Sequence, residues 1–284
     1  MDPCLYDAVL ASTKLTSTRK MAVDLDKVSD LLWRTWQCGQ TIAELPRDLR
    51  LETREEGYSA QALLEQRSPG RVVGWKIAAT SKEGQKHINV TGPLAGRIFS
   101  ERLHGDGAVL SMRGNKMAVA EAEFVFAMAA SLVPRRDPYS VDECLVNVGG
   151  LYLGIEVPNS RYADYRSVGE ANLIADNACA HEFVLGPRVS AAWREADLSA
   201  HRVHASVMGY ARRYERDGIG ANVLGDPRIA LTWLVNELSK QGIVLASGQF
   251  VTTGTCLVPL EIEAGDSVTV DFGVFGRMNC SFSA

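Results

Sequence analysis

The chain has 284 residues, of which 46% are apolar, a share that supports a sizeable hydrophobic core. Acidic residues outnumber basic ones by 34 to 30, and no basic block occurs, so we expect binding neither to nucleic acid nor to an anionic membrane. No apolar run approaches the roughly 18 residues that span a bilayer.

The N-terminus lacks the apolar stretch of a secretory signal, and Met21, an alternative start, comes directly before a strong helix pattern. We therefore predict an N-terminal extension over 1–21 and a single domain over 22–284. The six cysteines are scattered without a C-x-x-C pair, which is typical of reduced, buried thiols in a cytoplasmic protein.

The first part of the domain, 22–92, is predicted to be mainly helical. Apolar residues recur at helical spacing between Asp24, a candidate N-cap, and Gly39, which ends the pattern. Further along we predict a short helix over 58–67, a strand over 71–79 and a helix over 81–90.

From 93 to 284, short apolar runs alternate with glycine-rich turns, as in a large mixed β-sheet structure. One strong helix over 226–242, with Asp226 at its cap, interrupts them, and the last two strands are predicted to form a hairpin at Gly276. The fold class is therefore α+β: a helical N-terminal segment packed on a mixed sheet.

Glu121 and Glu123 are the most informative acidic residues. Because they are two residues apart in an apolar, strand-like segment, both carboxylates project from the same face. Two like charges in a partly dry site repel each other unless a cation neutralises them. The alternative is a strand edge on which both side chains face water.

Glu156 is a lone acid inside a second apolar run, where an ionised carboxylate needs a partner. Together the three glutamates predict an all-oxygen site for Mg²⁺ or Mn²⁺. Zinc is disfavoured, since no histidine or cysteine lies at ligand spacing from these acids.

Lys76 lies on the mostly apolar strand over 71–79, so it either extends to solvent from the end of the strand or projects into a pocket. In a pocket it could bind a substrate carboxylate or transfer a proton, and we expect burial and nearby cations to lower its pKa. Glu83 and His87, four residues apart on the next helix, share a face and could form an acid–base dyad, or they could be an exposed helix pair.

The motifs of a serine hydrolase, a P-loop NTPase and a dinucleotide-binding enzyme (G-x-S-x-G, G-x-x-x-x-G-K-[ST] and G-x-G-x-x-G) are absent from the sequence. What the chain contains instead is an ordered series of segments: GWKIAATS, PLAGRIF, AEAEFVFAM, GIEVPNSRYADY, IADNACAHEFVLG, GDPRIALTWLVNEL, GIVLASGQFVTTGT and AGDSVTVDFGVFG. In this order, from about residue 22 to the end, they resemble the 2-keto-4-pentenoate hydratase branch of the fumarylacetoacetate hydrolase superfamily, which also contains 4-oxalocrotonate decarboxylases.

The resemblance implies a mixed β-sheet roll, assembly into homo-oligomers and a Mg²⁺ or Mn²⁺ site. The family's metal ligands fall on Glu121, Glu123 and Glu156, and its active-site lysine falls on Lys76. A family residue near the substrate's carboxylate falls on Thr255.

Other positions of the family pattern carry less certain roles or differ. Asn177, with Asp176, matches an A-D-N turn that either shapes the pocket wall or contacts substrate. The chain departs from the pattern at Thr91 and Leu94, where many hydratases carry acids. Glu83 and His87 are the candidates to replace the missing acid.

For such an enzyme the resemblance implies hydration of a 2-hydroxy-2,4-dienoate to a 4-hydroxy-2-oxo acid in the breakdown of aromatic compounds. Alternatives are decarboxylation of 4-oxalocrotonate, hydrolysis of an acylpyruvate, or a silent subunit of an oligomer. The expected partners are a small 2-oxo acid, further copies of the chain and a sister decarboxylase or hydratase.

Overall fold

The computed structural model describes residues 22–190, 192–210 and 212–284. The extension predicted over 1–21 lies outside these residues. No helix in the described ranges has both the length and the apolar character needed to cross a membrane.

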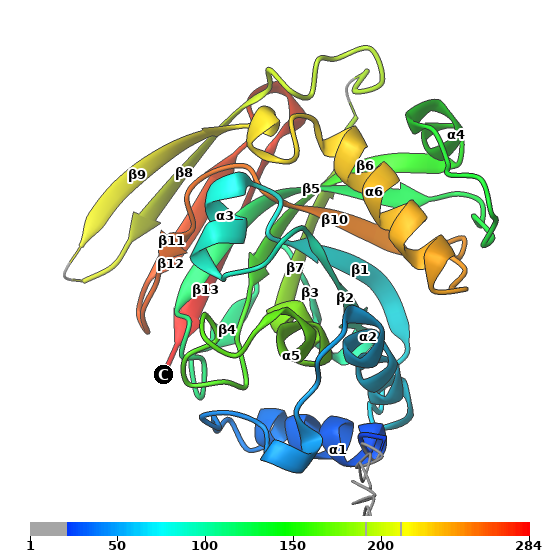
Figure 1. Ribbon diagram of the computed structural model, residues 1–284. Coiled ribbons are helices and arrows are strands. Elements are labelled where there is room, and N and C mark those ends of the chain that lie inside the picture. The colour runs from blue at the N-terminus through cyan, green and yellow to red at the C-terminus, as the bar shows by residue number, and fades with distance from the viewer. Residues whose placement is uncertain (1–21, 191, 211) are drawn as a thin grey trace, which may run out of the picture.

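Within the described residues the strands form two sheets (Figure 1). The larger, eight-stranded sheet has the order β2-β1-β10-β5-β6-β7-β3, with β11 paired to β5, and the five-stranded sheet has the order β4-β13-β12-β8-β9. The strands are β1 Val72–Ala78, β2 Leu94–Phe99, β3 Leu103–Gly105, β4 Val109–Ser111, β5 Val119–Met128, β6 Val148–Val157, β7 Glu182–Arg188, β8 Arg202–Met208, β9 Arg213–Ile219, β10 Phe250–Thr255, β11 Leu260–Glu261, β12 Ser267–Asp271 and β13 Arg277–Ser283.

The helices lie around these sheets. They are α1 Leu25–Gln37, α2 Arg54–Ala62, α3 Lys82–His87, α4 Val141–Leu145, α5 Glu170–Ala175 and α6 Pro227–Lys240, with the 3₁₀ turns η1 Arg47–Leu49, η2 Leu63–Gln66, η3 Ser100–Arg102, η4 Asn177–Cys179, η5 Gly220–Asn222 and η6 Gly273–Phe275. Asp24 and Asp226 cap α1 and α6 as predicted, each accepting a hydrogen bond from a backbone N–H of the first turn.

Two sequence-based boundaries were wrong. The helix predicted over 58–67 begins earlier, at Arg54, because Thr53 and Glu56 form a reciprocal capping box. It also ends earlier, and its last residues continue as η2. In the region 93–284, where short apolar runs were predicted to be strands, the run NLIADN at 172–177 instead belongs to α5 and η4.

One extensive core lies between the sheets and includes Phe124, Phe126 and Phe272, all fully buried. A second cluster joins α1, α2 and α5, which lie together at one end of the molecule (Figure 1). The α+β class and the mixed β-sheet architecture are confirmed. The helical segment 22–92 is continuous with the rest, since β1 pairs with β2 and β10.

The cysteines within the described ranges are unpaired thiols. Cys144, Cys179, Cys256 and Cys280 are buried as predicted, whereas Cys38, just after α1, is exposed. Cys4 lies outside the described residues.

Candidate metal centre

Antiparallel pairing of β5 with β6 brings the three predicted glutamates together. Glu121 lies directly opposite Glu156, and Glu123 lies opposite Gly154, two pairs further along the ladder. A carboxylate oxygen from each glutamate lies within 4.8 Å of the others. The period-two spacing of Glu121 and Glu123 thus places both carboxylates on the face to which Glu156 also points.

This cluster is largely dry. Glu123 and Glu156 are almost fully buried, and Glu121 is half-buried. Burial and then the neighbouring Glu156 raise the pKa of Glu121 to about 7, and burial with both neighbours raises the pKa of Glu123 well above its usual range. The water-exposed strand edge, the alternative interpretation of these acids, is therefore wrong for Glu123.

Two of the carboxylates also have an unused oxygen. Among the described residues, Glu123 Oε1 and Glu156 Oε2 have no hydrogen-bond partner. A buried carboxylate oxygen without a partner is costly unless a cation or water satisfies it. Three convergent carboxylates with unsatisfied oxygens fit a hard divalent cation.

The other oxygen of Glu123 is held by the backbone. Gly254 N–H donates to Glu123 Oε2 at 2.9 Å from a bulge in β10, where the register with β5 shifts. Gly254 has φ +95°, and an added Cβ would lie 2.2 Å from Thr80 Oγ1. Only glycine fits here, so the bulge orients the glutamate by a backbone donor.

Lys76 joins the cluster from β1. Its Nζ lies 2.9 Å from Glu156 Oε1 and donates to the carbonyl oxygen of Ala178 at 3.0 Å. β1 and β6 are three strands apart in the sheet order, about 14 Å in a flat sheet. A direct ion pair across that interval requires the sheet to curl into a roll, with these side chains inside it.

The pKa of Lys76 moves opposite to the sequence-based expectation. Burial lowers it, but Glu156, Glu121, Cys179 and Glu123 together raise it above its usual value. Lys76 is therefore a cation at neutral pH, suited to holding an anion or donating a proton, and it is buried rather than extended to solvent.

The turn that receives Lys76 has an unusual backbone. Asn177, Ala178 and Cys179 all have positive φ angles, of 54°, 51° and 61°. Asn177 holds the turn in place, because its side chain accepts from Arg97 N at 2.7 Å and donates to Arg97 O at 2.9 Å. Both ends of the Asn177 amide are thus used in supporting the wall of the roll.

The remaining predicted residues lie further out. Thr255 is half-buried at the end of β10, opposite Glu123, and its hydroxyl donates to Leu257 O at 2.8 Å. Glu83 and His87 are exposed on α3, and neither a hydrogen bond nor an ion pair joins them. His87 Nε2 instead lies 3.3 Å from the hydroxyl of Tyr165.

Tyr165 was not identified from the sequence. Burial, then Cys179 and, further down, Glu121 raise its pKa, so the phenol lies within electrostatic reach of the carboxylate cluster. Tyr165 lies eight residues after the end of β6 and is the last residue of the segment GIEVPNSRYADY, which gave it no role. Only the prediction of a role for His87, which contacts Tyr165, pointed to this part of the molecule.

Thr91, at a position where many hydratases carry an acid, lies beside a carboxylate from another element. Its N–H and hydroxyl contact Glu170 Oε1 at 3.3 and 3.2 Å. Glu170 also pairs with Arg54 at 2.6 Å, and Arg54 bridges to Glu237 at 3.1 Å. Leu94, the other departure, is fully buried in the core.

Two buried arginines in the resemblance segments are bound within the framework. Arg97 pairs with Glu65 at 2.7 Å, and its guanidinium lies 4.7 Å from the centre of the Trp75 ring. Arg161 pairs with Asp176 and donates to the carbonyl oxygens of Asn159 and Ala180, both at 2.9 Å. Their charges are therefore already neutralised away from the three glutamates.

Known proteins share this sequence pattern and fold. The chain is 27% identical over 266 residues to a 2-keto-4-pentenoate hydratase of Paraburkholderia xenovorans (strain LB400), covering 91% of this chain and 95% of that protein. It is 29% identical over 259 residues to a 2-hydroxyhexa-2,4-dienoate hydratase of Comamonas testosteroni, covering 88% and 93%. No protein-family model matches the chain.

Among solved structures, a 4-oxalocrotonate decarboxylase from Pseudomonas putida G7, complexed with magnesium and adipate, matches with a TM-score of 0.80. The two are 22% identical, and the match covers 91% of this chain and 97% of that one. At this identity the likeness concerns the fold.

The curled mixed sheet and its internal cluster of three carboxylates, which could hold a divalent cation, define the chain as an α+β protein with a candidate metal centre. In sequence the chain is similar to hydratases of 2-keto-4-pentenoate and of 2-hydroxyhexa-2,4-dienoate, and in fold it is similar to a 4-oxalocrotonate decarboxylase.

Proposed function

We propose that the protein is a divalent-metal-dependent hydratase that adds water to a 2-hydroxy-2,4-dienoate and forms a 4-hydroxy-2-oxo acid. The relatives named as hydratases of 2-keto-4-pentenoate and of 2-hydroxyhexa-2,4-dienoate support this substrate class.

The observation that carries the proposal is a three-carboxylate cluster beside one ammonium group. In the described residues, Lys76 is the cation that acts on the pKa values of Glu121 and Glu123. A substrate with a single carboxylate needs one such cation, whereas 4-oxalocrotonate carries two carboxylates. Because Arg97 and Arg161 are occupied by Glu65 and Asp176, the monocarboxylate is favoured.

Glu121, Glu123 and Glu156 would hold the metal, which we propose to be Mg²⁺ or Mn²⁺ because all the ligand atoms are oxygens. When bound, such a cation acts as a Lewis acid that stabilises negative charge on a substrate oxygen, a contribution of several kcal/mol. The magnesium in the decarboxylase structure supports the choice of metal.

The chain's own residues would do the rest. Lys76, held as a cation, binds the substrate carboxylate and donates a proton. Thr255, opposite Glu123, contributes a hydroxyl near that carboxylate, and Asn177 keeps the turn that receives Lys76 in place. We assign proton exchange at the far end of the dienoate to His87 and to Glu83 on the same helix. Tyr165, whose hydroxyl lies beside His87, would take part with it.

A direct assay tests the function. With Mg²⁺, 2-hydroxypenta-2,4-dienoate or a longer alkyl homologue should lose its conjugated ultraviolet absorbance, and mass spectrometry should show a gain of one water without CO₂. If CO₂ is released from 4-oxalocrotonate and no water is added to any dienoate, the protein is a decarboxylase and the proposed hydratase activity is wrong.

We place this activity in the cytoplasm, in the catabolism of aromatic compounds. We also propose that the chain forms a homo-oligomer that associates with a sister decarboxylase, because the branch contains both activities. Sedimentation of the purified protein and co-purification with a co-expressed decarboxylase would test the two associations.

A further inference from the structure

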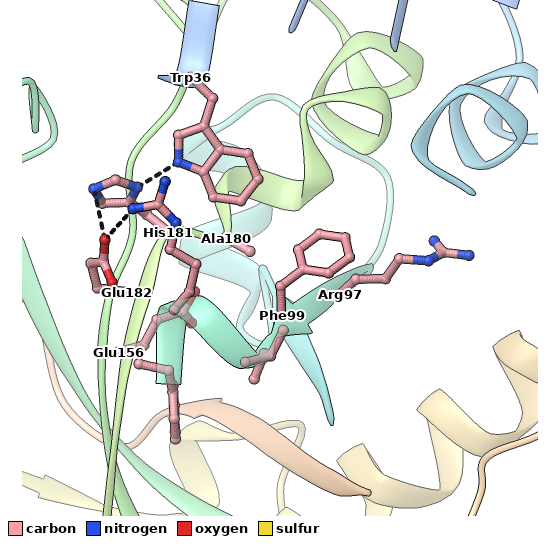
Figure 2. A pocket seen from close by; sticks show the side chains of 10 residues that line it. Trp36, Arg97, Phe99, Glu156, Ala180, His181 and Glu182 are labelled. Carbon is pink, nitrogen blue, oxygen red and sulfur yellow. Dashed lines mark hydrogen bonds and ion pairs between the residues drawn. The ribbon is translucent and has the colours of Figure 1, made fainter. Parts of the chain in front are cut away.

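A second polar site lies outside the carboxylate cluster. The end of α1, the residues around β3 and β4, and the start of β7 line a cleft of about 640 Å³, large enough for a small organic ligand. Its wall carries Trp36, Arg102, His104, His181 and Arg113. A small cavity of about 10 Å³, space for roughly one water, lies between this wall and Glu156 (Figure 2).

The tautomer of His181 is determined by its contacts. The Trp36 indole Nε1–H donates to His181 Nδ1 at 2.8 Å, so the imidazole proton is on Nε2 (Figure 2). Burial, above all, lowers the pKa of His181 to about 4, with Arg102 and Arg161 acting in the same direction against Glu182. The ring is therefore a neutral, buried N–H donor at physiological pH.

This donor has no acceptor. Glu182 Oε1 is the nearest carboxylate oxygen to Nε2, at 3.7 Å, beyond hydrogen-bond distance, and no other group in the described ranges accepts from it. Although the ring is largely buried, Nε2 itself is not enclosed by protein, so it can donate to water or to a ligand in the cleft that His181 lines. The His181 side chain is only 10% exposed, so its orientation is held by the surrounding residues.

The two acids that line the cleft, Glu101 and Glu182, already accept hydrogen bonds from other side chains. Glu182, the buried acid of the cleft, is bound by Arg102 and His104, each at 2.6 Å, and these contacts lower its pKa despite burial. Arg102 also stacks over Trp36, 5.1 Å from the ring centre, which fixes its guanidinium. Arg113, two residues after β4, also lines the cleft, is exposed and forms no ion pair with any described residue.

We propose that this cleft binds a small oxyanion, a short dicarboxylate or a phosphate group, between Arg102, Arg113 and the Nε2–H of His181. The combination of a fixed neutral donor with two guanidinium groups matches the geometry of carboxylate and phosphate recognition. The site is independent of the proposed hydration reaction, because none of its ligands belongs to the metal cluster.

Calorimetric titration of the metal-free full chain at constant ionic strength tests the proposal, with inorganic phosphate and malonate as separate probes. Saturable binding of one of them is expected, and the preferred probe distinguishes phosphate from carboxylate ligands. Arg113→Gln and Arg102→Gln should each raise its Kd about tenfold or more, the loss expected for one charge-assisted contact.

Two matched variants separate this site from others. Arg136→Gln, which removes an equally exposed arginine from the loop before α4, should leave the Kd unchanged. Lys76→Met, which disables the metal-site cation, should also leave it unchanged. Equal affinity in wild type, Arg113→Gln and Arg136→Gln would overturn the proposal. So would a structure of an oligomer with a side chain of a second copy inserted between Arg102 and Arg113.

Discussion

The ion pair between Lys76 and Glu156 is nearly inaccessible to water, with side chains 4% and 3% exposed. In such surroundings the loss of one partner leaves an uncompensated charge, which costs about 3–5 kcal/mol, whereas exposed pairs contribute about 1 kcal/mol or less. Substitution of Lys76 is therefore expected to change both stability and activity.

We predict that Lys76→Ala lowers kcat/KM by about a hundredfold or more, the usual effect of losing an acid–base or charge-stabilising group. Lys240→Ala, at an exposed position at the end of α6, serves as the control and should retain activity. Steady-state kinetics with the dienoate, alongside circular dichroism to verify the fold, would decide. A near-normal kcat/KM would show that Lys76 has only a structural role.

Glu123 has one oxygen bound by Gly254 and one free for a cation. Glu123→Gln should weaken Mg²⁺ binding by about a hundredfold or more, since even residues that only support a ligand contribute ~10–100-fold. Titration calorimetry measures this, with exposed Glu195→Gln as the control. Full activity of wild type after treatment with EDTA would contradict the metal requirement.

At the scale of elements, the contact between β2 and η4 determines where Lys76 points. Gly96 lies opposite Lys76 in the β1–β2 ladder, and a Cβ at this position would lie 2.4 Å from Asn177 O and 3.0 Å from Lys76 Cδ. The absent side chain lets the left-handed turn approach the strand closely. Three successive residues with positive φ, at roughly 1–2 kcal/mol each, are held by this approach and by Asn177.

Gly96→Ala should therefore reduce the free energy of unfolding by about 1–3 kcal/mol, the usual cost of overpacking, and should lower kcat as Lys76 is displaced. Gly105→Ala in β3, where nothing lies within 4 Å of the added Cβ, should change stability by less than about 0.5 kcal/mol. Urea denaturation of both variants provides the comparison. If Gly96→Ala and Gly105→Ala were equally stable, η4 would be able to move away from the new side chain at residue 96 without loss of stability.

At the scale of the whole molecule, metal binding and protonation are linked. In the metal-free protein the pKa of Glu121 is raised to about 7 from its usual 4.5. Between these pH values the folded state retains a proton that the unfolded state has released, so the free energy of unfolding falls as pH rises through this window. A cation binds the ionised carboxylates and stabilises the folded state. Metal binding therefore offsets the decrease in the free energy of unfolding at higher pH.

We predict that saturating Mg²⁺ raises Tm more at pH 8 than at pH 5.5, measured by calorimetry with EDTA-treated protein as reference. Glu121→Gln should reduce the difference between the two pH values, because its amide does not titrate. Equal Mg²⁺ shifts at both pH values in wild type would show that these carboxylates are already ionised without metal.

Much of this organisation follows from local rules. The helices at 24–39 and 226–242 and the hairpin at Gly276 were predicted because caps, helical spacing and a turn glycine act over a few residues. The start of α2 was missed because the capping box of Thr53 and Glu56 lies in a charged segment without an apolar period.

Sequence patterns alone were enough to identify the acids that could hold a metal. Glu121 and Glu123 share a face because strand periodicity is a local property, and isolated glutamates in apolar runs need a cation wherever they fold. The family resemblance rests on the same short segments. These conclusions require no knowledge of which strands are neighbours.

Which distant groups meet depends on the three-dimensional fold. The ion pair of Lys76 with Glu156 depends on the curl of a sheet in which their strands are three positions apart, and curvature results from the packing of the whole core. Likewise, Arg161 is bound by Asp176, while the Nε2–H of His181 has no acceptor in the part of the chain that the structure describes. Pairs of residues that are distant in the chain leave no periodic pattern in the sequence. Which of them form depends on how burial and charge balance in the folded molecule.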